Sequence, residues 1–173
     1  ELPYNLHIFV NSVEFIAKVI DTLKLAPEAV KIVCSTSGES REENQRKLGN
    51  AYPIGQPSDP AKKINFYTST CFEGCDIFDP DGVTFIVSDG RKAHTLLDIS
   101  TLFTQICGRI RDSRYKAQIV HVYSTTKYSK AVTLDEFVAA TQRTLADAEN
   151  YAAEINSLSD ATRVKTLSKI PYI

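Results

Sequence analysis

Apolar and polar positions in the first part of the chain switch between strand-like and helix-like patterns. The compact apolar run "LHIFV", residues 6–10, predicts a strand. Apolar residues at helical spacing follow and predict a helix: Val13, Ile16, Ala17, Ile20 and Leu23. Pro27 marks a turn, after which "AVKIVCS", residues 29–35, predicts a second strand. The chain therefore opens with a strand, a helix and a strand.

A short polar helix and a proline-rich loop are predicted next. Ser40 and Glu43 form a capping-box pattern, which predicts that a helix begins at Ser40. Gly49 is expected to end this helix, and residues 50–63 hold three prolines that are typical of a loop. Two further strands are predicted at residues 64–69 and 83–89.

The most regular apolar stripe of this region predicts a helix over residues 99–110. Its members are Ile99, Leu102, Phe103, Ile106 and Ile110, and we expect them to face the core. Gln105 and Arg109 lie four residues apart, one turn from each other on another face. A fifth strand is predicted at residues 117–124. The pattern indicates an α/β domain with a mainly parallel sheet of about five or more strands, covered on both faces.

The tail of the chain changes character after residue 130. Thr133 and Glu136 form a capping box that predicts one long amphipathic helix, and residues 159–169 predict a shorter one. We therefore expect an α/β domain at residues 1–130 and a helical extension at residues 131–173.

Composition narrows the class of protein. The 173 residues are 43% hydrophobic, enough for one domain with a substantial core, and the formal charge of −1 excludes a histone-like protein. No apolar run approaches the roughly 18 residues of a membrane span, and the first residues do not resemble a signal peptide. We expect an intracellular protein without a membrane partner. Because the chain begins at Glu1 without Met, we expect a part of a longer protein.

The cysteines and histidines do not form a metal-binding pattern. Only Cys71 and Cys75 are close in sequence, and no histidine lies near them. We predict reduced thiols that serve packing, no metal site, and structural roles for His7, His94 and His121.

Candidate chemistry follows the predicted strands. In a parallel sheet, functional groups lie in the loops beyond the carboxyl ends of the strands. Residues 68–76, "TSTCFEGCD", follow one strand in this way, and residues 105–111, "QICGRIR", lead toward another. Hydroxyls, acidic groups and arginines are thereby expected at one edge of the sheet.

These segments resemble motifs of the C-terminal RecA-like domain of superfamily 2 helicases. Residues 6–13 resemble motif IV, residues 68–76 motif V and residues 105–111 motif VI, in the family's order. The resemblance extends over about residues 5–125. It implies a three-layer RecA-like fold and a role as half of an ATP-dependent nucleic-acid motor.

The resemblance also implies roles in nucleotide binding and catalysis. Arg109 matches an arginine that meets the γ-phosphate of ATP, and Gln105 and Arg111 accompany it. Asp76 matches a carboxylate that accepts from the ribose, beside Glu73 and the turn-forming Gly74. ATP and Mg²⁺ would be bound mainly by an N-terminal RecA-like domain, the expected partner.

Contacts with a nucleic acid, with DNA favoured over RNA, are implied for five residues. These are Asn11, Ser12, Ser35, Thr68 and Ser69. In the family, hydroxyls and main-chain N–H groups at such positions bind the sugar–phosphate backbone.

The second arginine departs from the commonest family pattern, G-R-x-x-R. Here Arg111 follows Arg109 by two residues, as in herpesvirus-type origin-binding helicases, and Arg114 is a reserve candidate. If the helix continues past Gly108, Arg111 points away from Arg109 by roughly 200°. If Gly108 ends the helix, both arginines can serve one site.

Other interpretations of these residues stay open. Glu73 and Asp76 could cap a turn, and Arg109 could form a surface pair with Asp112. No phosphate-binding loop or DEAD-type box is present, so the chain alone is expected to be inactive. A non-catalytic RecA-like module that binds nucleic acid or a partner, or a small-molecule-binding α/β domain, are the alternatives.

Overall fold

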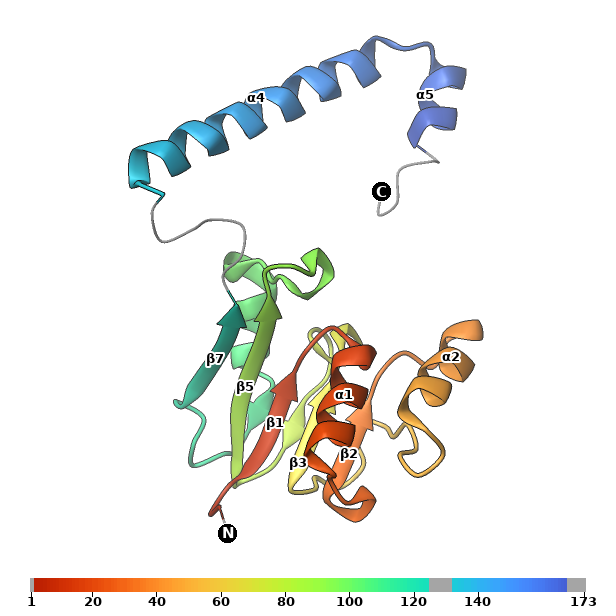
Figure 1. Ribbon diagram of the computed structural model, residues 1–173, viewed down its shortest axis with the longest axis vertical. Helices are drawn as coiled ribbons and strands as arrows, with labels where there is room; N and C mark the ends of the chain where they lie inside the picture. The colour runs from red at the N-terminus through yellow and green to blue at the C-terminus, as the bar shows by residue number, and fades with distance from the viewer. Residues whose placement is uncertain (1, 125–131, 168–173) are drawn as a thin grey trace. The chain divides into compact units, whose positions relative to one another are not determined.

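A computed structural model of the chain describes residues 2–124 and 132–167. Contacts divide the chain into two compact units, Glu1–Lys127 and Tyr128–Ile173. The first unit contains the strands β1 (Asn5–Phe9), β2 (Val30–Val33), β3 (Ile64–Tyr67), β5 (Gly82–Asp89) and β7 (Ile119–Ser124). These strands form one parallel sheet in the order β2-β3-β1-β5-β7 (Figure 1). The predicted α/β class and all five predicted strands are confirmed, with bounds that shift by at most two residues.

Short elements connect the strands. The helices of the first unit are α1 (Val13–Leu23), α2 (Glu39–Leu48) and α3 (Thr104–Cys107), and the π-helical segment Ile99–Phe103 leads into α3. Short 3-10 turns occupy Pro27–Ala29, Ser69–Cys71 and Ala93–Thr95. A small parallel ribbon, separate from the main sheet, joins β4 (Ile77–Phe78) to β6 (Ile110–Arg111).

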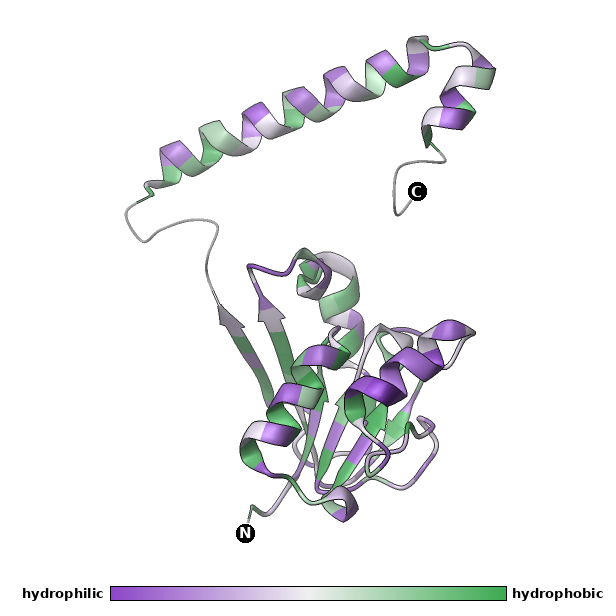
Figure 2. Ribbon diagram, turned by 45° about the vertical axis from the view of Figure 1, so that its right-hand side comes forward, coloured by the Kyte–Doolittle hydropathy of each residue, from purple (hydrophilic) through white to green (hydrophobic). Residues whose placement is uncertain are grey.

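Helix α1 covers one face of the sheet. Ser12 begins it, since its side chain accepts a 3.2 Å hydrogen bond from the amide of Phe15. Ile16 and Ile20 point inward and are buried, in a cluster that includes Ile32 and Phe66 of the sheet. In Figure 2 the strands are coloured mainly as hydrophobic, whereas α2 is mainly hydrophilic.

The opposite face of the sheet carries a second core. Phe9, Tyr67 and Ile86 stand in one row across three strands and are buried. Ile77 of the small ribbon and Ile106 of α3 pack against this row. The segments that resemble motifs V and VI therefore cover one face of the sheet.

Two predicted helix boundaries are wrong. Helix α2 begins at Glu39 rather than at Ser40, because Gly38 precedes it with φ 51° and ψ −137°, a conformation suited to glycine. The predicted capping box at Ser40 does not form, whereas Gly49 ends α2 as predicted.

The predicted helix over residues 99–110 is also wrong in part. Its first turn is π-helical, Asp98 caps it, and Ile99 is 76% exposed rather than in the core. Helix α3 ends at Gly108, and Ile110 belongs to β6. The rest of the stripe lies inward as predicted: Ile106 and Ile110 are buried, and Leu102 and Phe103 pack against the core.

The second unit consists of α4 (Leu134–Ser157) and α5 (Asp160–Leu167). The predicted capping box is confirmed. The amide of Thr133 donates to the Glu136 carboxylate at 2.8 Å, and the amide of Glu136 donates to the Thr133 hydroxyl at 3.3 Å. The predicted end of α5, at residues 168–169, lies outside the described residues. None of the helices within residues 2–124 and 132–167 combines the length and the apolar character that a membrane crossing requires.

Candidate functional site

One register pair of the β4–β6 ribbon is buried and the next is exposed. Ile77 and Ile110 are register partners and are buried, with 3% and 5% of their surface exposed. Phe78 and Arg111 are the next register partners and are exposed. The carbonyl of Arg109 accepts from the amide of Ile77 at 2.9 Å, as the parallel pairing of Ile77 with Ile110 requires. Arg109, directly before β6, and Arg111 thus flank the buried Ile110 in the chain.

Both arginines contact the turn that leads into β4. Arg109 donates from Nη1 to the carbonyl of Cys75 at 2.9 Å and from Nε to the carbonyl of Gln105 at 3.0 Å. Arg111 donates from Nε and Nη2 to Oδ1 of Asp76 at 2.9 and 2.8 Å. The Arg111–Asp76 pair is about half exposed, so its contribution to stability is at most about 1 kcal/mol. Either partner can exchange this contact for a ligand at little cost.

Helix α3 ends at Gly108, which is the case in which Arg111 was expected to be able to join Arg109. The chain leaves the helix there, and Ile110–Arg111 form β6. Arg114 pairs instead with Asp81. Within residues 2–124 no ion pair joins Arg109 to an acidic residue, so the surface pair with Asp112 does not form.

The other predicted nucleotide residues surround this pair. Gly74 has φ 70°, which an L side chain adopts only with strain, so glycine suits the turn. Glu73 is exposed, and its carboxylate makes no hydrogen bond or ion pair within the described residues. The same holds for the side-chain amide of Gln105, whose main-chain carbonyl receives Arg109. Neither Glu73 nor Asp76 caps the turn through a described hydrogen bond.

Polar residues meet at the carboxyl edge of the sheet, as predicted from the strand ends. One row of register partners crosses β1, β3 and β2 and consists of Phe9, Tyr67 and Val33. Two residues after each of them along the chain come Asn11, Ser69 and Ser35. Asn11 donates to the carbonyl of His94 at 2.8 Å and accepts from the amide of Ser69 at 3.3 Å. Ser35 pairs with the hydroxyl of Ser37 at 3.1 Å.

Two of the five predicted nucleic-acid residues are buried. Ser12 is 8% exposed and caps α1, and Thr68 is 6% exposed with its hydroxyl 2.9 Å from that of Thr70. Ser69 and Thr70 are the exposed hydroxyl residues beside them. Thr70 was not among the predicted site residues, although it belongs to the same run of three hydroxyl residues, "TST".

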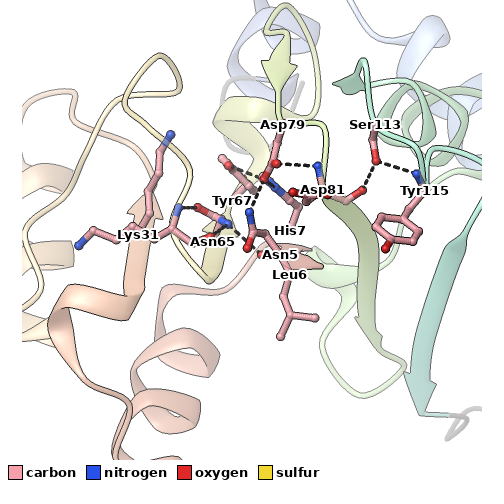
Figure 3. A network of polar contacts seen from close by, with 12 residues as sticks. Asn5, Leu6, His7, Lys31, Asn65, Tyr67, Asp79, Asp81, Ser113 and Tyr115 are labelled. Carbon is pink, nitrogen blue, oxygen red and sulfur yellow. Dashed lines mark hydrogen bonds and ion pairs between the residues drawn. The ribbon is translucent and has the colours of Figure 1, made fainter. Parts of the chain in front are cut away.

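A buried polar network fixes the far end of β4 (Figure 3). The ring of His7 is fully buried, with Nε2 2.8 Å from Oδ2 of Asp79 and Nδ1 3.1 Å from the hydroxyl of Tyr67. Asn5 also donates to Oδ2 of Asp79, at 3.0 Å, and the amide of Asp81 donates to Oδ1 at 2.9 Å. The network ties the residue that follows β4 to the central strand β1.

Burial and hydrogen bonding set the charges of this network. Burial lowers the pKa of His7, although the hydrogen bond to Asp79 opposes this effect. Burial also disfavours the ionised form of Asp79, but hydrogen bonds from His7 and Asn5 outweigh it and lower the pKa. Both shifts favour a neutral imidazole beside an ionised carboxylate. The burial and the two hydrogen bonds of the His7 ring agree with the structural role predicted for it.

The cysteines serve packing. All four thiols are free, and the Cys75 thiol donates to the carbonyl of Cys71 at 3.3 Å. Burial raises the pKa of Cys71 to about 12, which leaves little reactive thiolate.

Comparison of the chain with protein-family models, with curated proteins and with solved structures found no match.

Proposed function

We propose that this chain is the C-terminal RecA-like domain of a superfamily 2 helicase or translocase. It would supply arginines to an ATP site between two domains and a polar edge to a nucleic-acid strand, with DNA favoured. The observation that carries the proposal is that Arg109 and Arg111 contact adjacent residues of one turn, the carbonyl of Cys75 and the carboxylate of Asp76.

The chemistry of phosphoryl transfer accounts for this arrangement. Negative charge develops on the phosphoryl oxygens in the transition state, and guanidinium groups stabilise it with several fixed donors. Arg109 uses two of its five N–H groups on carbonyls within the described residues, which leaves donors for a phosphate. Asp76 uses only Oδ1 for Arg111 there, so Oδ2 can accept from a ribose hydroxyl.

A second RecA-like domain would complete the site. It would bring the phosphate-binding loop and the carboxylates that hold Mg²⁺, neither of which the sequence contains. The exposed hydroxyls of Ser69 and Thr70 would face the nucleic-acid backbone at the carboxyl edge of the sheet. In this proposal the chain is half of an enzyme.

The test compares ATP hydrolysis by the chain alone with hydrolysis by a protein in which an N-terminal RecA-like domain accompanies it. We expect turnover stimulated by single-stranded DNA only when both domains are present. Calorimetry of the chain alone with ATP and Mg²⁺ should give little heat, because one half-site leaves the phosphates in water. Submicromolar ATP binding by the chain alone would contradict the half-site. Strand binding without any turnover in the two-domain protein would favour the non-catalytic module.

A further inference from the structure

Helix α4 of the second unit carries a stripe of residues with a strict seven-residue repeat. The stripe begins at Leu134 and continues in alternating steps of four and three residues to Ile155. Its members are Leu134, Val138, Thr141, Leu145, Ala148, Ala152 and Ile155, all apolar except Thr141. The spacing corresponds to a period of about 3.5 residues, that of the two core positions of a coiled coil.

Most of this stripe is exposed among the described residues. Leu134 and Leu145 are 75% and 58% exposed, whereas Ile155, near the end of α4, is partly buried. Helix α5 has 8 residues and is about 12 Å long, whereas α4 has 24 residues and is about 36 Å long. The neighbouring helix of the same unit is therefore too short to cover the stripe.

The period of the stripe favours a helical partner over a flat surface. An α-helix has about 3.6 residues per turn, so a seven-residue repeat drifts around the helix by about 20° per heptad. Over the three heptads of α4 the stripe would turn away from a flat surface by roughly 60°. A second helix of similar length that winds around α4 keeps contact with the whole stripe.

The α4 helix of a second copy of the chain has the required length. Among the helices within residues 2–124 and 132–167, the next longest is α1, with 11 residues. The charges beside the stripe also allow two copies to pair in parallel. Asp135 and Glu149 flank the stripe on one side, and the neutral residues Thr144 and Tyr151 flank it on the other. In a parallel pair, Thr144 faces Glu149 of the second copy, so acidic side chains do not meet there.

We propose that two copies of this chain associate through α4 in a parallel, two-stranded coiled coil. Leucine, valine and isoleucine side chains of the two stripes pack against each other, whereas the small Ala148 and Ala152 and the polar Thr141 weaken the interface. Association therefore depends on concentration, with a dissociation constant on the order of micromolar or weaker. The proposal concerns only α4 and is independent of the proposed ATP site of the first unit.

The test is sedimentation equilibrium of the 173-residue chain over a range of micromolar concentrations. The mass should rise from 19.2 kDa toward twice that value as the concentration increases. Leu145→Gln keeps a good helix former and should weaken association by about tenfold or more, because both copies lose an apolar contact. Ala148→Leu should strengthen association by about tenfold or more, because it adds apolar volume to the interface. Ala146→Leu is the matched control, since it makes the same change on the same helix outside the stripe.

Cysteine substitutions test the parallel arrangement. In a parallel pair the two copies of residue 141 lie opposite each other, so Thr141→Cys should give a disulfide-linked dimer after mild oxidation. Arg143→Cys lies on the outer side of the pair and should not cross-link.

A chain that stays monomeric at all these concentrations would overturn the coiled coil. Equal strengthening by Ala148→Leu and Ala146→Leu would also overturn it, because the association would then not depend on the stripe. A dimer that Thr141→Cys does not cross-link would overturn the parallel arrangement.

Discussion

His7 connects the outer ribbon to the centre of the sheet through one side chain. It lies in β1, is fully buried, and contacts Asp79 directly after β4. Because Asp79 directly follows β4, the network fixes the end of that strand. The cost of burying these polar groups is offset by hydrogen bonds to both ring nitrogens and both carboxylate oxygens.

This network predicts that the chain loses stability in acid. The pKa of His7 is lowered from 6.5 and that of Asp79 from 3.8, so both groups bind protons more weakly in the folded chain than in the unfolded one. The free energy of unfolding should therefore fall as the pH drops below 6.5, and fall again below 3.8. Urea unfolding, followed by tyrosine fluorescence at several pH values, measures this.

Two variants test whether His7 causes the loss of stability that begins below pH 6.5. His7→Asn should flatten the change that begins at pH 6.5, whereas His121→Asn, at an exposed histidine, should keep it. The same pH slope in His7→Asn and in the native chain would show that His7 does not cause it.

At the carboxyl edge of the sheet, exposure separates two neighbouring hydroxyl residues. Ser69 is exposed, whereas Thr68 is buried and bonded to Thr70. In the two-domain protein, Ser69→Ala should weaken single-strand binding by about 0.5–1.5 kcal/mol, the value of one neutral hydrogen bond, with little dependence on base sequence. Fluorescence anisotropy measures the affinity, and Thr22→Ala, at an exposed hydroxyl near the other end of α1, is the control. Equal affinities of the Ser69→Ala and native proteins would remove Ser69 from the strand contact.

Among the elements, the β4–β6 ribbon matters most for the candidate site. Each of its two strands is only two residues long, yet the ribbon places Arg111 beside Asp76. Gly82 lets the ribbon and β1 approach each other: a Cβ atom there would lie 2.9 Å from Nε2 of His7 and 3.1 Å from Ile110.

Two glycine substitutions test this packing. Gly82→Ala should lower the free energy of unfolding by about 1–3 kcal/mol, because the contacted side chains are buried and must shift. Gly108→Ala should change it by no more than about 0.5 kcal/mol, because φ is −96° and the nearest atom would be 3.6 Å away. Denaturant unfolding compares the two variants, and equal stabilities would contradict the close approach at Gly82.

Elements in which a periodic apolar pattern repeats over many residues were predicted from the sequence, whereas elements too short to show such a pattern were missed. The strand at 83–89 and the helix from Val13 follow from apolar spacing over many residues, and both are present. A two-residue strand such as β6 has no measurable period, so its partner could not be predicted. The π-helical start at Asp98 and the glycine start of α2 depend on local backbone geometry that apolar spacing does not encode.

The candidate site was predicted as a set of residues, not as an arrangement. The end of the helix at Gly108 was one of two open cases, and the structure selects it. The contacts of Arg109 with Cys75 and of Arg111 with Asp76 join segments more than thirty residues apart, which spacing alone cannot pair. The burial of Thr68 likewise depends on the fold around it.

At the scale of the whole molecule, the chain consists of an α/β unit and a helical unit whose long helix α4 begins at a capping box. The proposal is that Arg109 and Arg111 of the α/β unit act on a nucleotide held between this unit and a second RecA-like domain.

The most direct measurement of that claim is ATP turnover, stimulated by single-stranded DNA, in the two-domain protein. Arg109→Ala should reduce turnover by about 10³-fold or more, and Arg111→Ala should also reduce it strongly, because both residues contact the same turn, at Cys75 and Asp76. Arg114→Ala removes an arginine of the same segment that pairs with Asp81, and it should keep native turnover. Native turnover in Arg109→Ala would contradict the account.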